Sequence, residues 1–110
     1  MARKREKVEA GSGDVFVDLG FADARERRLR VQLAMRINEL IAARELTQAR
    51  AAALFGIPQP HVSELKNYKL TRFSSERLLR FLTQLDRDVE ILIRPKARGR
   101  GAGHLRVSMA

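Results

Sequence analysis

The sequence predicts an all-α fold in which four helices share one hydrophobic core and a short β-strand follows the last helix. Apolar residues recur at three- and four-residue steps from Leu29 to Ile41 and from Leu78 to Leu85, as they do in helices with one buried face. Between these stretches, residues suited to helix starts and ends mark two shorter helices. Residues 89–93 alternate with a period of two instead, which is typical of a strand.

The first helix is expected to begin near Asp23, whose carboxylate can accept hydrogen bonds from the unpaired amides of the first turn. Its buried stripe consists of Leu29, Leu33, Ile37, Leu40 and Ile41. The same helix also carries Arg25, Arg27, Arg28 and Arg30. We interpret these arginines as a solvated face, with a contact to DNA flanks or to an acidic partner as the alternative.

Two short helices follow, and the sequence marks their ends. Thr47 is expected to cap a helix that runs through Phe55, and Gly56 supplies the left-handed conformation that ends it. A third helix is expected over Gln59–Asn67, because Pro60 is tolerated in a first turn, where its missing N–H has no helical partner to lose.

The last helix and the strand close the folding unit. Ser74 is placed to cap the fourth helix, whose inward stripe is Leu78, Phe81, Leu82 and Leu85. Because a lone strand leaves backbone groups unpaired, Val89–Ile93 needs a partner, which is either Val15–Leu19 or the same segment of a second subunit. The alternative is that Val89–Ile93 simply lies on the helical bundle.

Composition divides the chain into three parts. Residues 1–13 are expected to form a flexible basic tail, because their charged and glycine-rich sequence can bury almost nothing. Residues 14–94 form the folding unit. Residues 95–110, in which glycines are interleaved with basic residues, are expected to form a second flexible basic tail.

Charge and composition exclude several classes of function. The 22 lysines and arginines outnumber the 13 acidic residues and give a net charge of +9, which favours nucleic acid as a partner. With no cysteine and two histidines, neither of which has a suitably spaced acid or nucleophile, we expect no enzyme activity, no cofactor and no metal site. Without a signal segment or an apolar stretch near the roughly 20 residues of a membrane span, a cytoplasmic protein is expected.

The second and third helices have the spacing of a helix-turn-helix motif, whose second helix enters the major groove of DNA. Ala52 stands where the two helices would cross most closely, and Gly56 makes the turn. The second helix of the motif is anchored inward by Ile57, Val62 and Leu65. The segment Leu46–Leu65 resembles the λ-repressor-type (Xre) helix-turn-helix.

A wider resemblance covers most of the chain. The segments Val15–Phe21, Phe73–Leu78 and Asp88–Ile91 are similar to the corresponding parts of HigA-type antitoxins. This resemblance implies an all-helical DNA-binding domain, usually dimeric, that represses its own operon and sequesters a RelE- or HigB-like RNase toxin. Because one short helix contacts few base pairs, we expect the homodimer to bind a pseudo-palindromic operator.

The residues expected to face the DNA bases lie on the third helix, opposite Val62 and Leu65. They are Gln59, Pro60, His61, Ser63 and Glu64. Glutamine can pair with adenine, glutamate can accept from cytosine, and serine or neutral histidine can donate to a purine. Pro60 departs from the repressor pattern, and its apolar ring can contact only a thymine methyl group.

Contacts to the phosphate backbone are expected at both ends of the motif. At its start, Thr47 and Gln48 open a helix whose free amides can bind a phosphate. After the third helix, the loop expected to meet the backbone carries Lys66, Asn67, Lys69, Thr71 and Arg72. A solvated charged loop is the alternative for any one of these residues.

Three functions stay open: a HigA-type antitoxin and autorepressor, a stand-alone Xre-type regulator, and a basic RNA-binding or nucleoid-associated protein. The first requires a partner surface, and we expect the segment through Phe21 to fold on contact with a toxin. The alternative is that Val15–Phe21 caps the core or pairs with Val89–Ile93. The aromatic residues are spread over core-like positions, which disfavours single-stranded RNA as the ligand.

Overall fold

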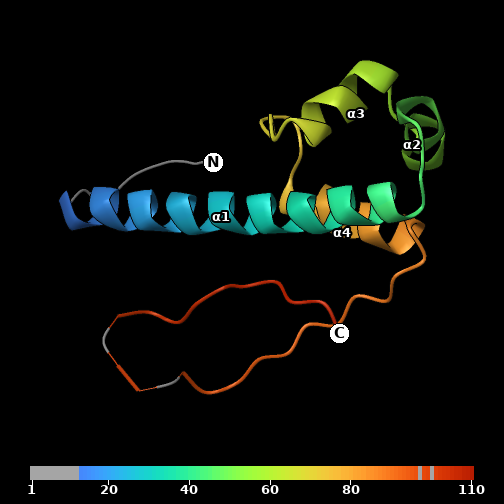
Figure 1. The fold of residues 1–110 in the computed structure, drawn as a ribbon. Helices are drawn as coiled ribbons and strands as arrows, with labels where there is room; N and C mark the ends of the chain where they lie inside the picture. Colours follow the sequence, from blue (N-terminus) through green and yellow to red (C-terminus); the bar gives the residue numbers. More distant parts are fainter. Residues whose placement is uncertain (1–12, 97, 100) are drawn as a thin grey trace.

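The computed structural model describes residues 13–96, 98, 99 and 101–110, with side chains from residue 24 onward. It contains four helices (Figure 1): α1 (Gly13–Ala43), α2 (Gln48–Phe55), α3 (Gln59–Lys66) and α4 (Ser75–Gln84). α1 packs against α3 and α4, and α2 packs against α3 and α4. The prediction of an all-α bundle is confirmed.

The first helix is longer than expected. α1 begins at Gly13, so Asp23 lies inside it rather than at its N-cap, and Val15–Leu19 is helical rather than extended. Both predictions were wrong for the same reason. The run from Ala22 to Arg28 consists largely of good helix formers, which favours propagation of the helix toward the N-terminus, whereas a strand at Val15–Leu19 would have needed a paired neighbour.

The predicted strand at Val89–Ile93 is absent from the described residues, where this segment is irregular. Its apolar side chains are largely exposed, at 78% for Ile91, 74% for Leu92 and 88% for Ile93. The alternative that the segment lies on the bundle is therefore wrong as well. Alternation alone does not make a strand, because the ladder of hydrogen bonds requires a second strand, and Val15–Leu19 is helical.

The caps predicted for α2 and α4 are confirmed. The Thr47 hydroxyl accepts a hydrogen bond from the Arg50 amide at 3.1 Å at the start of α2, and Ser74 does the same for the Arg77 amide at 3.1 Å at the start of α4. Gly56 ends α2 with φ +69°, a conformation that disfavours residues with a Cβ. Pro60 lies in the first turn of α3.

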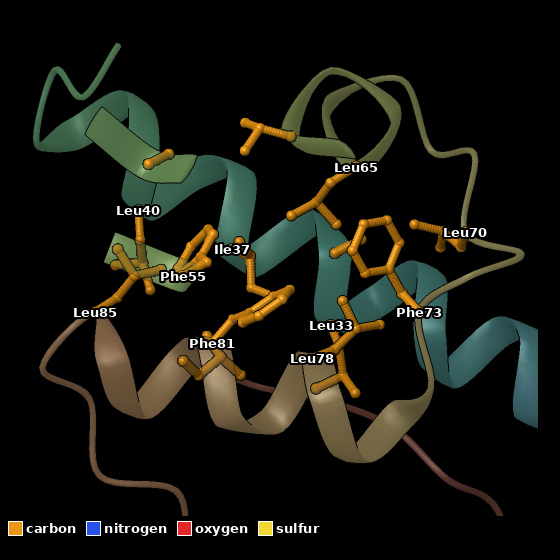
Figure 2. Packing of buried hydrophobic residues seen from close by; sticks show 14 of the residues in the cluster. Leu33, Ile37, Leu40, Phe55, Leu65, Leu70, Phe73, Leu78, Phe81 and Leu85 are labelled. Atoms are coloured by element: carbon orange, nitrogen blue, oxygen red, sulfur yellow. The ribbon is translucent and has the colours of Figure 1, made fainter. Parts of the chain in front are cut away.

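The core lies where the four helices meet (Figure 2). Its fully buried centre includes Phe73, Leu33, Ile37, Leu65, Leu78 and Leu85. Phe81 stacks on Phe55 with the ring centroids 4.3 Å apart and meets the edge of Phe73 with the centroids 6.0 Å apart. These contacts join α4 to α2 and to the loop after α3, so they hold the short helices in place.

Two segments extend away from this core. Figure 1 shows the N-terminal half of α1 projecting beyond the other helices, and among the described side chains of α1, packing on the core begins at Leu29. The C-terminal segment runs away from α4 and returns, where the Val107 amide donates to Oε1 of Gln32 at 2.6 Å and the Val107 side chain packs against the core. The division into residues 1–13, 14–94 and 95–110 stays a prediction, and residues 1–12 lie outside the described part.

Candidate nucleic-acid interface

The turn between α2 and α3 is tight. Both the Gly56 and the Ile57 amides donate to the Ala52 carbonyl, at 2.8 and 3.1 Å. Ala52 is 8% exposed at this junction, so its methyl group fits where a larger side chain would push the helices apart. The turn therefore fixes the direction in which α3 leaves α2.

α3 buries one face and leaves the other open. Val62 and Leu65 are 2% and 0% exposed and anchor the helix in the core. The five residues that sequence reasoning assigned to base contacts lie together on the rest of this helix: Gln59 and Pro60 are exposed, and His61, Ser63 and Glu64 are half-buried. α3 therefore presents a short polar surface about two turns long.

Hydrogen bonds from side chains secure the C-terminal end of α3. Nδ2 of Asn38 on α1 donates to the Leu65 carbonyl at 3.3 Å, and Nδ2 of Asn67 donates to the Ser63 carbonyl at 2.9 Å. The Ser63 and Leu65 carbonyls also accept from the backbone amides of Asn67 and Tyr68, both at 3.1 Å, so each side-chain amide adds a second hydrogen bond to a carbonyl at this helix end. Asn67, assigned from sequence to a phosphate contact, thus has a structural bond as well.

At the start of α2, Thr47 is exposed and Gln48 is half-buried. The Thr47 hydroxyl already accepts from Arg50, which leaves the Gln48 and Ala49 amides of the first turn as the donors nearest a ligand. The two residues assigned to a phosphate contact thus lie at a helix N-terminus, as expected.

The end of α3 and the loop between α3 and α4 carry the side chains predicted to meet the DNA backbone. Lys66, Lys69, Thr71 and Arg72 are all exposed. The loop is anchored by Leu70 and Phe73, which are 8% and 0% exposed. Its cationic side chains are therefore carried on a fixed backbone at the end of α3.

Two arginines that the sequence did not connect with this loop hold it in place. Nη1 of Arg30 on α1 donates to the Leu70 carbonyl at 3.1 Å and to the Phe73 carbonyl at 3.5 Å. Nη1 of Arg77 donates to the Arg72 carbonyl at 3.2 Å, and its guanidinium carbon lies 5.3 Å from the Phe73 ring centroid. Arg30 was interpreted as part of a solvated face. Its partners lie 40 or more positions away, and no local pattern in the sequence signals such a contact.

Glu64 and Arg72 form an ion pair across the gap between α3 and the loop. Nε of Arg72 lies 2.5 Å from Oε1 of Glu64, and Nη2 lies 3.3 Å from Oε2. The hydrogen bond from Arg72 lowers the pKa of the Glu64 carboxyl, and the same bond raises the pKa of Arg72. The two groups were assigned separately from sequence, to a cytosine and to a phosphate, yet the structure brings them together.

The fold agrees with the comparisons to known proteins. The model of a family described as the helix-turn-helix domain matches residues 15–94. The chain belongs to this helix-turn-helix family. A solved structure named as a candidate XRE family transcriptional regulator is 51% identical, with a TM-score of 0.75, over 80% of this chain and 99% of that chain.

Because the identity is 51% over 80% of this chain, the protein also belongs to the XRE family of transcriptional regulators. The assignment made from Leu46–Leu65 is confirmed, whereas the likeness to HigA-type antitoxins stays a prediction. Neither match is to an enzyme family, and no curated protein matches the chain.

Two further observations concern the described residues alone. They contain no cluster of three or more side chains that could hold a metal ion. None of their helices is both long and apolar enough to cross a membrane.

Proposed function

We propose that this XRE-family regulator is a sequence-specific repressor that places α3 in the major groove of double-stranded DNA. The observation that carries the proposal is the arrangement of α3 and the loop after it. One face of the helix is buried, the other carries polar side chains, and exposed cationic residues adjoin its C-terminal end. This is the arrangement by which a recognition helix contacts bases while neighbouring residues contact phosphates.

In this proposal, Gln59, His61 and Ser63 contact base edges, and Pro60 contacts a thymine methyl group. The phosphate contacts come from Thr47 and Gln48 at the start of α2, from Lys66 at the end of α3, and from Asn67, Lys69 and Thr71 after it. The net charge of +9 adds attraction that does not depend on sequence, so affinity should fall steeply with salt.

The proposal includes a homodimer on a pseudo-palindromic operator, because a helix of eight residues contacts few base pairs. The exposed apolar residues Ile91, Leu92 and Ile93 are the proposed subunit contact. Three neighbouring apolar side chains more than 70% exposed are unfavourable in water, and a second copy would cover them.

The finer proposal is that the repressor is the antitoxin of a toxin-antitoxin module, which autoregulates its operon and neutralises a RelE- or HigB-like RNase. The resemblance of its sequence to HigA-type antitoxins supports this, as does the projection of α1 beyond the bundle, where a partner can reach it (Figure 1). The alternative is a stand-alone regulator. If an adjacent gene encodes a small basic RNase and this RNase co-purifies with the chain, the antitoxin role is supported. If the gene for this chain stands alone, the stand-alone regulator is supported.

The DNA-binding proposal is tested by selecting duplexes from a random library and measuring affinities for the selected sequence and its single-base variants. Gln59→Ala should relax preference at a defined position, with a loss of about 1 to 3 kcal/mol on the selected sequence only. Lys69→Ala should weaken all sequences alike and reduce the salt slope by about one. If both variants lowered affinity uniformly, α3 would not be the recognition helix.

A further inference from the structure

Hydrogen bonds hold both the side chain and the backbone of Arg72. Its guanidinium is engaged by both carboxylate oxygens of Glu64, and its backbone carbonyl accepts from Nη1 of Arg77. The backbone on either side is anchored by Arg30, which donates to the carbonyls of Leu70 and Phe73. Long side chains on a protein surface normally lose much rotamer freedom on binding, and a side chain already fixed in place loses less.

We propose that Arg72, aligned by Glu64, is a specificity-determining residue that contacts a guanine in the major groove, and that Glu64 is a positioning residue. This deepens the proposed function and rests on it. It replaces the expectation, drawn from sequence alone, that Glu64 accepts from a cytosine and that Arg72 contacts a phosphate.

The hydrogen-bonding capacity of the pair supports this assignment. A guanidinium has five N–H donors, and the bonds to Glu64 use Nε and one hydrogen of Nη2. Nη1 and the second hydrogen of Nη2 form a second, parallel pair of donors, which matches the O6 and N7 acceptors of guanine. Both oxygens of Glu64 accept from Arg72, so a cytosine amine would have to share the carboxylate with the guanidinium.

Charge distinguishes the base from the phosphate. Glu64 neutralises most of the charge of Arg72, so the pair gains little from a phosphate, which prefers an uncompensated cation. Guanine presents neutral acceptors whose recognition depends on the direction of the donors, and direction is what Glu64 fixes. The side chain of Arg72 is 45% exposed and that of Glu64 is 33% exposed, so the free donors stay accessible to DNA.

The position of the pair is also suitable. Glu64 lies in the last turn of α3, on the polar side that bears Ser63 and His61. The guanidinium of Arg72 is therefore brought from the loop to the edge of the helix surface that faces the bases. Lys66 and Lys69, which lie between Glu64 and Arg72 in the sequence and are exposed, remain for the phosphates.

The test uses the full chain, selection from a random duplex library, and affinities for the selected sequence and its single-base variants. Arg72→Lys keeps the positive charge but removes the planar set of N–H donors. Glu64→Gln keeps the shape of the side chain but removes the carboxylate. Both variants should lose preference for guanine at the same position, by about 5- to 150-fold, the range of one bidentate contact. When Arg72→Ala is already present, adding Glu64→Gln should not change the base preference further, because Glu64 acts through Arg72.

A matched control is Glu76→Gln on α4. This variant breaks an exposed ion pair in which Oε2 of Glu76 lies 3.5 Å from Nη2 of Arg80. This variant should leave the base preference unchanged. Thermal melting of each variant checks that the fold is retained, which is expected because the Glu64–Arg72 pair is exposed.

The possible results separate the hypotheses. If the wild-type chain selects no common sequence, the proposed function fails and this assignment fails with it. If the wild-type chain does select one but Glu64→Gln changes a position that the Arg72 variants leave intact, Glu64 contacts a base itself and the assignment is overturned. If Arg72→Ala weakens all sequences alike and Arg72→Lys leaves the base preference intact, Arg72 binds a phosphate and the assignment is again overturned.

Discussion

Gly56 offers a direct test of why the helix-turn-helix needs a glycine. Its φ of +69° lies in the left-handed region, and a Cβ built at this position would have no heavy atom within 4 Å. Gly56→Ala therefore introduces no clash and changes only the backbone preference. A left-handed conformation costs a non-glycine residue about 1 to 2 kcal/mol, and the more restricted unfolded chain offsets about 0.4 to 1 kcal/mol of that.

The expected net loss is about 1 kcal/mol, or a melting temperature about 4 to 8 °C lower for a domain of this size. Urea unfolding followed by circular dichroism measures this loss of stability. The slope of the unfolding free energy against urea concentration should stay unchanged. Gly103→Ala is the matched control, because Gly103 has no left-handed φ and equally open surroundings. Equal stability of the two variants would refute the conformational argument, and a loss above about 3 kcal/mol would indicate a clash that the structure excludes.

Three further predictions concern the core, the ion pair and the subunit contact. Phe81 is 3% exposed and packs between Phe55 and Phe73, so Phe81→Ala should destabilise the fold by about 3 to 5 kcal/mol in urea unfolding, and a loss below about 1 kcal/mol would contradict the packing described. The pKa of Glu64 is lowered from 4.5 in the folded chain, so the pair stabilises the fold above that pH and this contribution disappears as the pH falls below it. The difference in unfolding free energy between wild type and Glu64→Gln should shrink in that range, and a constant difference would mean that the ionised carboxylate contributes nothing. Ile91→Asp should shift sedimentation toward the monomer while circular dichroism stays helical, whereas Leu105→Asp, at a residue 55% exposed, should not, and an unchanged dimer after Ile91→Asp would exclude this contact.

Local signals in the sequence were sufficient for the middle of the fold. Thr47, Gly56 and Ser74 each act on backbone groups within a few residues, so a cap or a turn can be predicted without knowing what packs on it. The inward faces of α3 and α4 follow from helical spacing in the same way. These local rules also located the polar surface of α3 and the basic loop beyond it.

The sequence misled where the outcome depended on a partner distant in the chain. The alternation at Val89–Ile93 is a property of the segment, but a strand requires a second strand, and α1 contains Val15–Leu19 in helical form. Asp23 resembles an N-cap, but a cap acts only where the helix actually begins. In both cases the residues meet a local requirement of the element, but the element forms only if a second strand or a helix start lies in the right place.

The sequence by itself determined the helix-turn-helix, its caps and its basic character, because these depend on neighbouring residues and on composition. Only the tertiary structure decided what individual charged side chains do. Arg30 and Arg77 bind carbonyls of the loop after α3, and Glu64 meets Arg72 eight positions away. A charged side chain is long and flexible, so its partner is set by where the packed core places the backbone, and no sequence pattern near the residue specifies that position.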